Sequence, residues 1–184
     1  MKKTYVLDTN VLIQAPYAVE CFEENTVVLP MTVLEELDNM KKEEGEKGAN
    51  VRKVIRILDA HREKGNLLEG VRMEWGGILR VEKNYRNVEL PPDLPEHKSD
   101  NRILKVCVGL SNDLKEQVIL VTKDILLRIK AQLLGIQAED FGTEQVAVHE
   151  EQYLGRREVF VPEELFKDFK KKGVPVECVY CCDM

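Results

Sequence analysis

Residues 5–10 read YVLDTN, a short apolar run that ends at one acidic residue, Asp8. An acidic residue just past an apolar run, or at the start of a helical pattern, recurs in residues 29–38 (LPMTVLEELD), 98–104 (KSDNRIL) and 119–124 (ILVTKD). If the apolar runs are parallel strands of one sheet, their carboxyl ends meet at one edge, and side chains far apart in sequence converge there. The sequence therefore predicts a single acidic pocket at the edge of a parallel sheet.

An acidic pocket of this kind is expected to bind a divalent cation. Crowded carboxylates repel one another, and the repulsion raises their pKa values until a metal neutralises them, so such a cluster is poorly explained as a device for stability. Mg²⁺ and Mn²⁺ prefer oxygen ligands in octahedral geometry and keep several waters, so a few carboxylates and a substrate phosphate suffice. The candidate ligands are one acidic residue from each string: Asp8, Glu36, Asp100 and Asp124.

Length and composition limit the alternatives. A chain of 184 residues with 43% hydrophobic residues can bury one full core, with an appendage. Its net charge of −6 argues against binding nucleic acid by overall charge, although an acidic pocket contributes to that total. No apolar run is long enough to span a membrane, and five cysteines without framework spacing fit reduced thiols, so a cytoplasmic location is expected. Free thiols are also favoured over a zinc site at Cys178, Cys181 and Cys182, because their one Cys-x-x-Cys has no second pair.

Short strands and amphipathic helices alternate along the chain. Residues 4–7, 26–29 and 118–121 are apolar, partly β-branched runs typical of buried strands. Helical spacing follows in three segments, carried by Val51, Val54, Ile55 and Leu58; by Ile103, Leu104, Cys107, Val108 and Ser111; and by Ile125, Leu126, Ile129 and Leu133. Each of these helices is expected to pack its apolar face on the sheet. Pro30 is expected in the first turn of a further helix, and Gly135 is expected to end the last one.

Two segments depart from this alternation. Residues 67–73 and 78–82 flank the tetrapeptide EWGG at 74–77, whose paired glycines suit a tight turn with positive φ. We interpret this segment as an inserted β-hairpin. Residues 41–48 (KKEEGEKG) are expected to form a mobile connection beside the pocket rather than regular structure. The predicted fold class is therefore α/β, with a hairpin added.

The four strings together resemble the pattern of a PIN-domain nuclease: an Asp after the first strand, an acidic residue in the next helix, an Asp that opens a later helix, and a Thr-x-Asp after the fourth strand. The resemblance covers residues 1–148 and implies a three-layer α/β/α fold with a mostly parallel sheet, leaving 149–184 as a C-terminal extension or linker. Residues 35–38 (EELD), the glycine hairpin and residues 129–136 (IKAQLLGI) are similar to the PIN domain that precedes an ATPase in bacterial PhoH-like proteins. No Walker A string (GxxxxGK followed by Ser or Thr) occurs here, so a fragment or a stand-alone relative is expected.

This resemblance implies magnesium- or manganese-dependent cleavage of single-stranded RNA that leaves a 5′ phosphate on the downstream fragment. Asp8 and Asp124 are then the central metal ligands, and Glu36 and Asp100 act directly or through water. The expected partners are single-stranded RNA, a PhoH-like ATPase domain that is either fused or separate, and a second copy of the chain in a homo-oligomer, with no membrane.

Other residues are expected to support this site. Asn10 is expected to hold Asp8 through an amide hydrogen bond, and Thr122 to bond a carboxylate or a metal-bound water. The basic residues that could line an RNA groove are Lys41, Lys42, Arg52, Lys123 and Arg128.

Simpler interpretations of the acidic residues stay open. Asp8 could end a strand in an Asx turn, and Asp100 could be a helix N-terminal charge that the dipole favours. Glu35 and Glu36 point about 100° apart on a helix, so only one of them can face the pocket. The family pattern of Glu before Leu favours Glu36.

Three other functions compete with the nuclease. A non-catalytic PIN-fold module for RNA binding or ATPase docking predicts missing acidic ligands, whereas all four are present. A phosphatase of the haloacid dehalogenase type requires Asp-x-Asp, and Asn10 occupies the second position. A toxin of a toxin–antitoxin pair shares the nuclease chemistry, but such chains are usually shorter and lack the hairpin and the tail.

Overall fold

A computed structural model describes residues 2–142 of the chain. The predicted C-terminal extension (149–184), with Cys178, Cys181 and Cys182, lies outside the described residues. Within residues 2–142, no helix is long and apolar enough to cross a membrane. The elements are β1 (Lys3–Leu7), α1 (Thr9–Gln14), the 3₁₀ helix η1 (Pro16–Glu20), β2 (Thr26–Pro30), α2 (Met31–Met40), α3 (Gly45–Lys64), β3 (Val71–Arg72), β4 (Ile78–Glu82), α4 (Ser99–Asp113), β5 (Gln117–Val121), α5 (Ile125–Leu133) and β6 (Gln137–Glu139).

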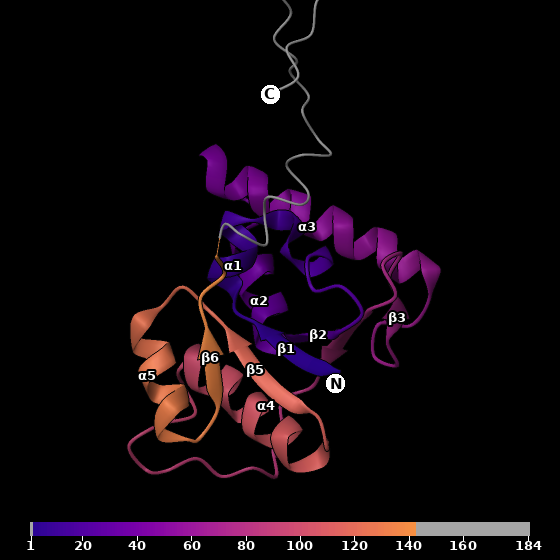
Figure 1. The fold of residues 1–184 in the computed structure, drawn as a ribbon. Helices are drawn as coiled ribbons and strands as arrows, with labels where there is room; N and C mark the ends of the chain where they lie inside the picture. The colour runs from indigo at the N-terminus through magenta and orange to yellow at the C-terminus, as the bar shows by residue number, and fades with distance from the viewer. Residues whose placement is uncertain (1, 143–184) are drawn as a thin grey trace, which may run out of the picture. The chain divides into compact units, whose positions relative to one another are not determined.

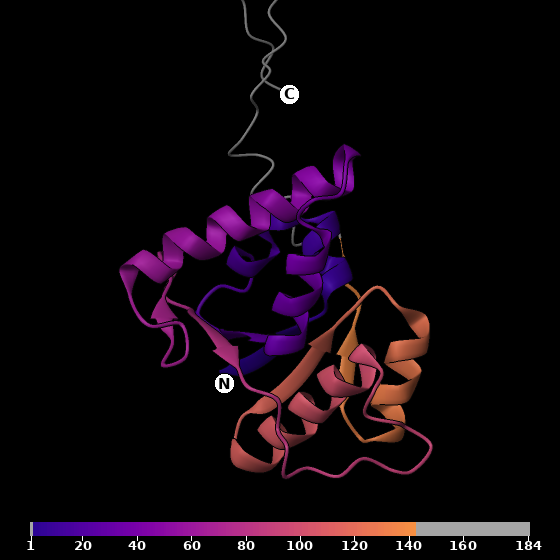
Figure 2. The ribbon, with the colours of Figure 1, turned by 180° about the vertical axis from the view of Figure 1, so that it is seen from behind.

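Six strands form one sheet in the order β3-β4-β2-β1-β5-β6, and every neighbouring pair is parallel except β3 with β4. Helices α1 and α3 cover one face of the sheet, and α4 and α5 cover the other (Figures 1 and 2). This confirms the predicted α/β fold with a mostly parallel sheet between helices. The central strands are buried on both faces, as their apolar runs predict, and Val6, Leu7, Leu29, Ile119 and Leu120 are fully covered.

The order of the strands creates a switch point beside β1. The chain passes from β1 to β2 and β4 in one direction, then returns to β5 on the other side of β1 and continues outward to β6. The connection that follows β1 and the connection that follows β5 therefore lie on opposite faces of the sheet. A crevice forms at such a point outside the carboxyl ends of the strands, and ligands of open α/β sheets bind there. Asp8 follows β1 and Thr122 follows β5 at this point.

The predicted hairpin is present, but it is part of the central sheet rather than an insertion. β4 pairs in parallel with β2, with Val28 opposite Arg80, while the short β3 pairs with β4 on its outer side. Gly76 has φ +92°, as a tight turn requires. Gly77 does not have a positive φ. A glycine is needed at this position because a Cβ there would lie 2.3 Å from the Glu23 carbonyl oxygen.

The prediction of an irregular connection at residues 41–48 is wrong in its second half, because α3 already begins at Gly45. Gly45 has φ +81°, and a Cβ at Gly48 would lie 1.8 Å from the carbonyl oxygen of Glu43. The two glycines therefore allow the backbone to turn back on itself more closely than residues with a Cβ would permit, and α3 starts within this turn. Pro30 also differs from the prediction: it ends β2 and is the N-cap of α2, one position before the first turn.

Helix α5 packs on the sheet through a face other than the predicted one. Leu127 and Ala131 are buried against the sheet layer, whereas the predicted face is exposed. The exposed fractions are 63% for Ile125, 67% for Leu126, 51% for Ile129 and 77% for Leu133. Periodicity identifies an apolar face of a helix but not what covers it, so the spacing alone led to the wrong side. Gly135, with φ +70°, follows the helix end as expected.

Candidate active site

Asp8 lies at the switch point, between the ends of β1 and β5. Its backbone N–H donates to the carbonyl oxygen of Val121 at 3.0 Å, which extends the strand pairing by one residue. The hydroxyl of Thr122 donates to Asp8 Oδ2 at 2.7 Å, and the amide of Asn10 approaches the same oxygen at 3.4 Å. Both contacts expected from the sequence are therefore present, and that from Thr122 is the shorter. The Asp8 residue is only 4% exposed.

Burial raises the pKa of Asp8 above its ordinary value of 3.8. Hydrogen bonds from Thr122 and from the backbone of Thr9 lower this pKa, while the charges of Glu36 and Asp100 raise it further. The net upward shift means that the surroundings disfavour the carboxylate form, because desolvation outweighs the two hydrogen bonds. A cation at this position would reverse that balance.

Glu36 is brought to the same place by α2. The hydroxyl of Thr9 donates to Glu36 Oε2, which ties the helix to the residue after Asp8. Glu35 points to the other side of the helix, where its Oε2 lies 3.3 Å from Nη1 of Arg102 in α4. The two neighbouring glutamates therefore diverge, as the helix geometry predicts, and Glu36 is the one beside Asp8.

Asp100 completes a group of three acidic residues around one open hollow of about 260 Å³. It lies in the first turn of α4, and Lys130 of α5 donates to its Oδ2 at 3.1 Å. The helix-start interpretation and the pocket interpretation of Asp100 are thus both compatible with its position. The hollow is lined by Asp8, Thr9, Asn10, Ile13, Glu36, Asn39, Met40, Lys47 and Asp100.

Asp124 does not line this hollow. It is the N-cap of α5, and its Oδ1 accepts from the backbone N–H groups of Leu126 at 2.7 Å and Leu127 at 3.3 Å. Its own backbone N–H donates to the Thr122 hydroxyl at 3.1 Å, the hydroxyl that also bonds Asp8. The structure therefore brings three of the four predicted acidic residues together and places the fourth next to them, in a capping position.

Most of the polar groups around the hollow are of the type that a hard divalent cation prefers, since Asp8, Glu36 and Asp100 offer carboxylate oxygens and their neighbours offer hydroxyl and amide oxygens. The raised pKa of Asp8 also shows that negative charge there lacks compensation. Each carboxylate nevertheless has a partner within the chain. Within residues 2–142, no three His, Cys, Asp or Glu side chains are already arranged as ligands of one metal ion. The residues fit such an ion in chemistry, and closure around it requires movement of their side chains.

The five predicted basic residues lie outside the hollow. Lys41 pairs with Asp38, and Arg52 donates to the backbone oxygens of Lys41 and Glu43, so Arg52 holds the turn before α3. Lys42 is exposed, Lys123 lies 3.8 Å from Asp140, and Arg128 is partly buried with no hydrogen-bond partner at its Nε.

Two other basic residues lie at the hollow: Lys47, which lines it and also pairs with Glu43, and Lys130, which pairs with Asp100. Lys47 was missed because its segment was expected to be irregular. Lys130 was missed because the buried face of α5 was assigned wrongly; it lies three residues after the buried Leu127, on the same side of the helix, and the correct face would have directed it inward.

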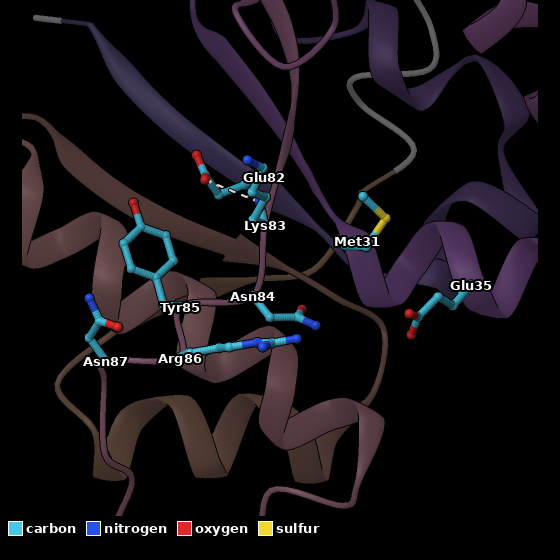
Figure 3. Close-up of a pocket in the computed structure, with 8 residues that line it drawn as sticks. All are labelled: Met31, Glu35, Glu82, Lys83, Asn84, Tyr85, Arg86 and Asn87. Carbon is cyan, nitrogen blue, oxygen red and sulfur yellow. Dashed lines mark hydrogen bonds between the residues drawn. The ribbon is translucent and has the colours of Figure 1, made fainter.

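Two further hollows continue along α2. One is lined by Met31, Leu34, Glu35, Asp38 and Asn39, and so shares Asn39 with the acidic hollow. The next, a cleft of about 580 Å³, shares Met31 and Glu35 with it and is bordered on its other side by the last residue of β4, Glu82, and the five residues that follow it (Figure 3). Sequence reasoning gave no signal for this cleft, because it depends on the packing of α2 and α4 on either side of the end of β4.

Comparison with known proteins gives matches over most of the chain. A profile of the PIN domain matches residues 5–142. Protein PhoH2 from Bacillus subtilis (strain 168) is 46% identical over 179 residues, which cover 94% of this chain and 40% of that protein. Protein PhoH2 from Mycolicibacterium smegmatis is 39% identical over 149 residues, covering 79% of this chain and 34% of that protein. The chain thus spans less than half the length of these two relatives.

Among solved structures, a domain of a functionally unknown protein from Methanocaldococcus jannaschii matches with a TM-score of 0.45 and 24% sequence identity. The match covers 76% of this chain and 91% of that one.

Proposed function

The chain belongs to the PIN-domain family, whose members are generally nucleases, and on that premise we propose that it is a divalent-metal-dependent endoribonuclease that hydrolyses single-stranded RNA. The observation that carries this proposal is the convergence of Asp8, Glu36 and Asp100 on one hollow at the switch point of the sheet. Three carboxylates from three separate elements are of little use for stability at such a place, but they suit a cation that engages a phosphate.

In the proposed mechanism, Asp8, Glu36 and Asp100 hold Mg²⁺ or Mn²⁺. When bound, this ion would lower the pKa of the attacking water and offset charge on the leaving oxygen. Thr122 keeps Asp8 oriented and Thr9 does the same for Glu36. Lys47 stands at the hollow to attract a phosphate. Because phosphate carries no base identity, this part of the site should cut with weak sequence preference.

We retain Asp124 in the proposed ligand set. Both of its capping hydrogen bonds go to Oδ1, and its backbone shares the Thr122 hydroxyl with Asp8. Its Oδ2 can therefore contribute to the site while the helix stays capped.

The second candidate is a non-catalytic PIN-fold module that binds RNA or docks onto a PhoH-like ATPase domain. One observation favours it: within residues 2–142 the carboxylates already have partners and form no ready-made metal site. The chain covers 40% of its Bacillus subtilis relative. A fused or separate ATPase partner, a homo-oligomer and a cytoplasmic location stay predictions from the sequence.

The two candidates are separated by incubating the full chain with end-labelled single-stranded RNA and with the same strand in a duplex. Mn²⁺, Mg²⁺ or excess chelator is supplied. We expect cleavage only with added metal, and faster cleavage of the single strand, because an A-form duplex holds its phosphates in a fixed backbone geometry. Asp8→Asn should abolish cutting, and so should Asp124→Asn, which keeps a good N-cap. RNA that is bound but uncut under every condition supports the module, and robust cutting in chelator contradicts the metal mechanism.

A further inference from the structure

Tyr85 is held in one position beside the cleft of about 580 Å³. Its ring packs against Gly109 of α4, where a Cβ would lie 2.2 Å from the ring atoms Cγ and Cδ1. Its hydroxyl donates to the Asp113 carboxylate, one turn further along α4. Contacts to a glycine and to a carboxylate on the same helix therefore fix an aromatic ring that also lines an open cleft.

The Tyr85 side chain is neutral over the whole physiological range. Burial raises the pKa of Tyr85 to about 12, and the Glu82 and Asp113 charges act in the same direction. A neutral ring held in advance loses little freedom when a flat ligand stacks on it, so less of the stacking energy is lost to ordering.

The polar side chains before and after Tyr85 in the chain suit a single-stranded RNA. Figure 3 shows the side chains of Asn84 and Arg86 extending from the segment after β4 toward α2, which carries Met31 and Glu35, whereas the Tyr85 ring points to the other side of this segment. The Thr32 hydroxyl donates to Asn84 Oδ1 at 3.3 Å, which fixes the amide orientation and directs its NH₂ group away from Thr32. An aromatic ring stacks on an unpaired base, and amide and guanidinium groups bind the polar groups of single-stranded RNA, so the two sides of this segment can contact successive nucleotides of one strand.

The two acidic residues of the cleft do not oppose an RNA strand. Glu35 is paired with Arg102 at 3.3 Å, and Glu82 with Arg80 at 2.9 Å. Lys83 and Arg86 are exposed, so the remaining charge of the cleft is positive. Electrostatics therefore favour a polyanion here, in contrast to the acidic hollow on the other side of α2.

The cleft is also continuous with the candidate active site. Three hollows follow one another along α2, joined by the shared residues Asn39, Met31 and Glu35. A strand whose phosphate lies in the acidic hollow can continue over α2 into the cleft. The successive residues Glu36 and Glu35 face the two ends of this path.

We propose that the cleft is a base-binding subsite, in which one unpaired nucleobase of the RNA strand stacks on Tyr85 while Asn84 and Arg86 contact the adjoining nucleotide. The proposal rests on the proposed ribonuclease function and adds to it a residue that selects unpaired over paired RNA. A base in a duplex is stacked between its neighbours and cannot present its face to Tyr85.

The test compares the full chain with Tyr85→Phe, which keeps the ring, and Tyr85→Leu, which keeps apolar bulk without it. Gly109→Ala displaces the ring from the opposite side. Trp75→Ala is the matched control, because Trp75 is an exposed aromatic residue in the turn at the opposite end of β4. Cleavage of single-stranded RNA in Mn²⁺ is measured, together with the melting temperature of each variant. Tyr85→Leu and Gly109→Ala should raise KM roughly tenfold with kcat little changed, as expected for one lost stacking contact. Tyr85→Phe, which loses the Asp113 contact but keeps the ring against Gly109, should raise KM less than Tyr85→Leu does, and Trp75→Ala should keep the wild-type KM.

A second measurement needs no variant. One abasic nucleotide is placed at successive positions along the RNA, and wild-type KM should rise at one position or two adjacent ones, with no further rise for Tyr85→Leu there. In a wild type that cuts RNA with metal, an unchanged KM at every abasic position overturns the subsite and leaves the ribonuclease standing. A wild type that cuts no RNA with any metal overturns both.

Discussion

Asp8 makes the acidic site costly to fold without a cation. It is 4% exposed, and its surroundings raise the pKa of its carboxyl group. A group whose pKa is higher in the folded than in the unfolded state stabilises the protein when protonated. That contribution is complete below the unfolded value, near 3.8, and is lost as pH rises through the higher folded pKa. At neutral pH the metal-free protein therefore bears the full cost of a buried carboxylate.

Asp8→Asn should consequently raise the melting temperature of the metal-free protein at pH 7. The amide oxygen can still accept from Thr122, while the desolvated charge is gone. Mn²⁺ should stabilise the wild type by about 2.7 kcal/mol at one hundred times its Kd, and the variant by much less. Scanning fluorimetry in chelator and in Mn²⁺ measures both effects. A variant that is less stable in chelator, yet shows the full Mn²⁺ shift, would mean that Asp8 is only a structural residue.

The sequence predicts helix α5 but does not determine which of its faces is buried. Asp124 caps it, and Leu127 and Ala131 attach it to the sheet, while its more regular apolar stripe is exposed. Helix existence followed from the spacing, and so did its end near Gly135. The buried side of α5 did not follow from the spacing, because the contacts that decide it come from β6 and α4, which lie on either side of α5 in sequence.

Two truncations in α5 test this packing. Leu127→Ala should lower the free energy of unfolding by about 2–5 kcal/mol, since a side chain that is 1% exposed leaves a cavity. Ile129→Ala should cost less than about 1 kcal/mol, because half of that residue is already in water. Urea unfolding of both variants gives the comparison. A larger loss for Ile129→Ala would restore the face that the spacing predicts.

At the scale of the whole molecule, the sequence predicted the parallel sheet and the meeting of strand ends because each acidic residue lies just past an apolar run or near the start of a helical pattern. It therefore predicted that four acidic residues converge, and three of them, Asp8, Glu36 and Asp100, line one hollow while Asp124 caps α5. It did not predict Lys47, Lys130 or the Tyr85 cleft, since these depend on where helices distant in sequence lie against one another. Local sequence patterns predict the strands, whereas the groups that lie between helices are found only in the packed fold.

The central claim is that the carboxylates of the acidic hollow cut RNA, and Glu36→Gln against Glu35→Gln tests it most directly. The two residues are adjacent, equal in charge and on one helix, but only Glu36 lines the hollow, while Glu35 faces Arg102. At saturating single-stranded RNA in Mn²⁺, which removes any effect of Glu35 on RNA binding in the neighbouring cleft, the cleavage rate should fall roughly a hundredfold or more for Glu36→Gln and stay within about threefold of wild type for Glu35→Gln. Equal rates for the two variants, with both folded, would contradict the account.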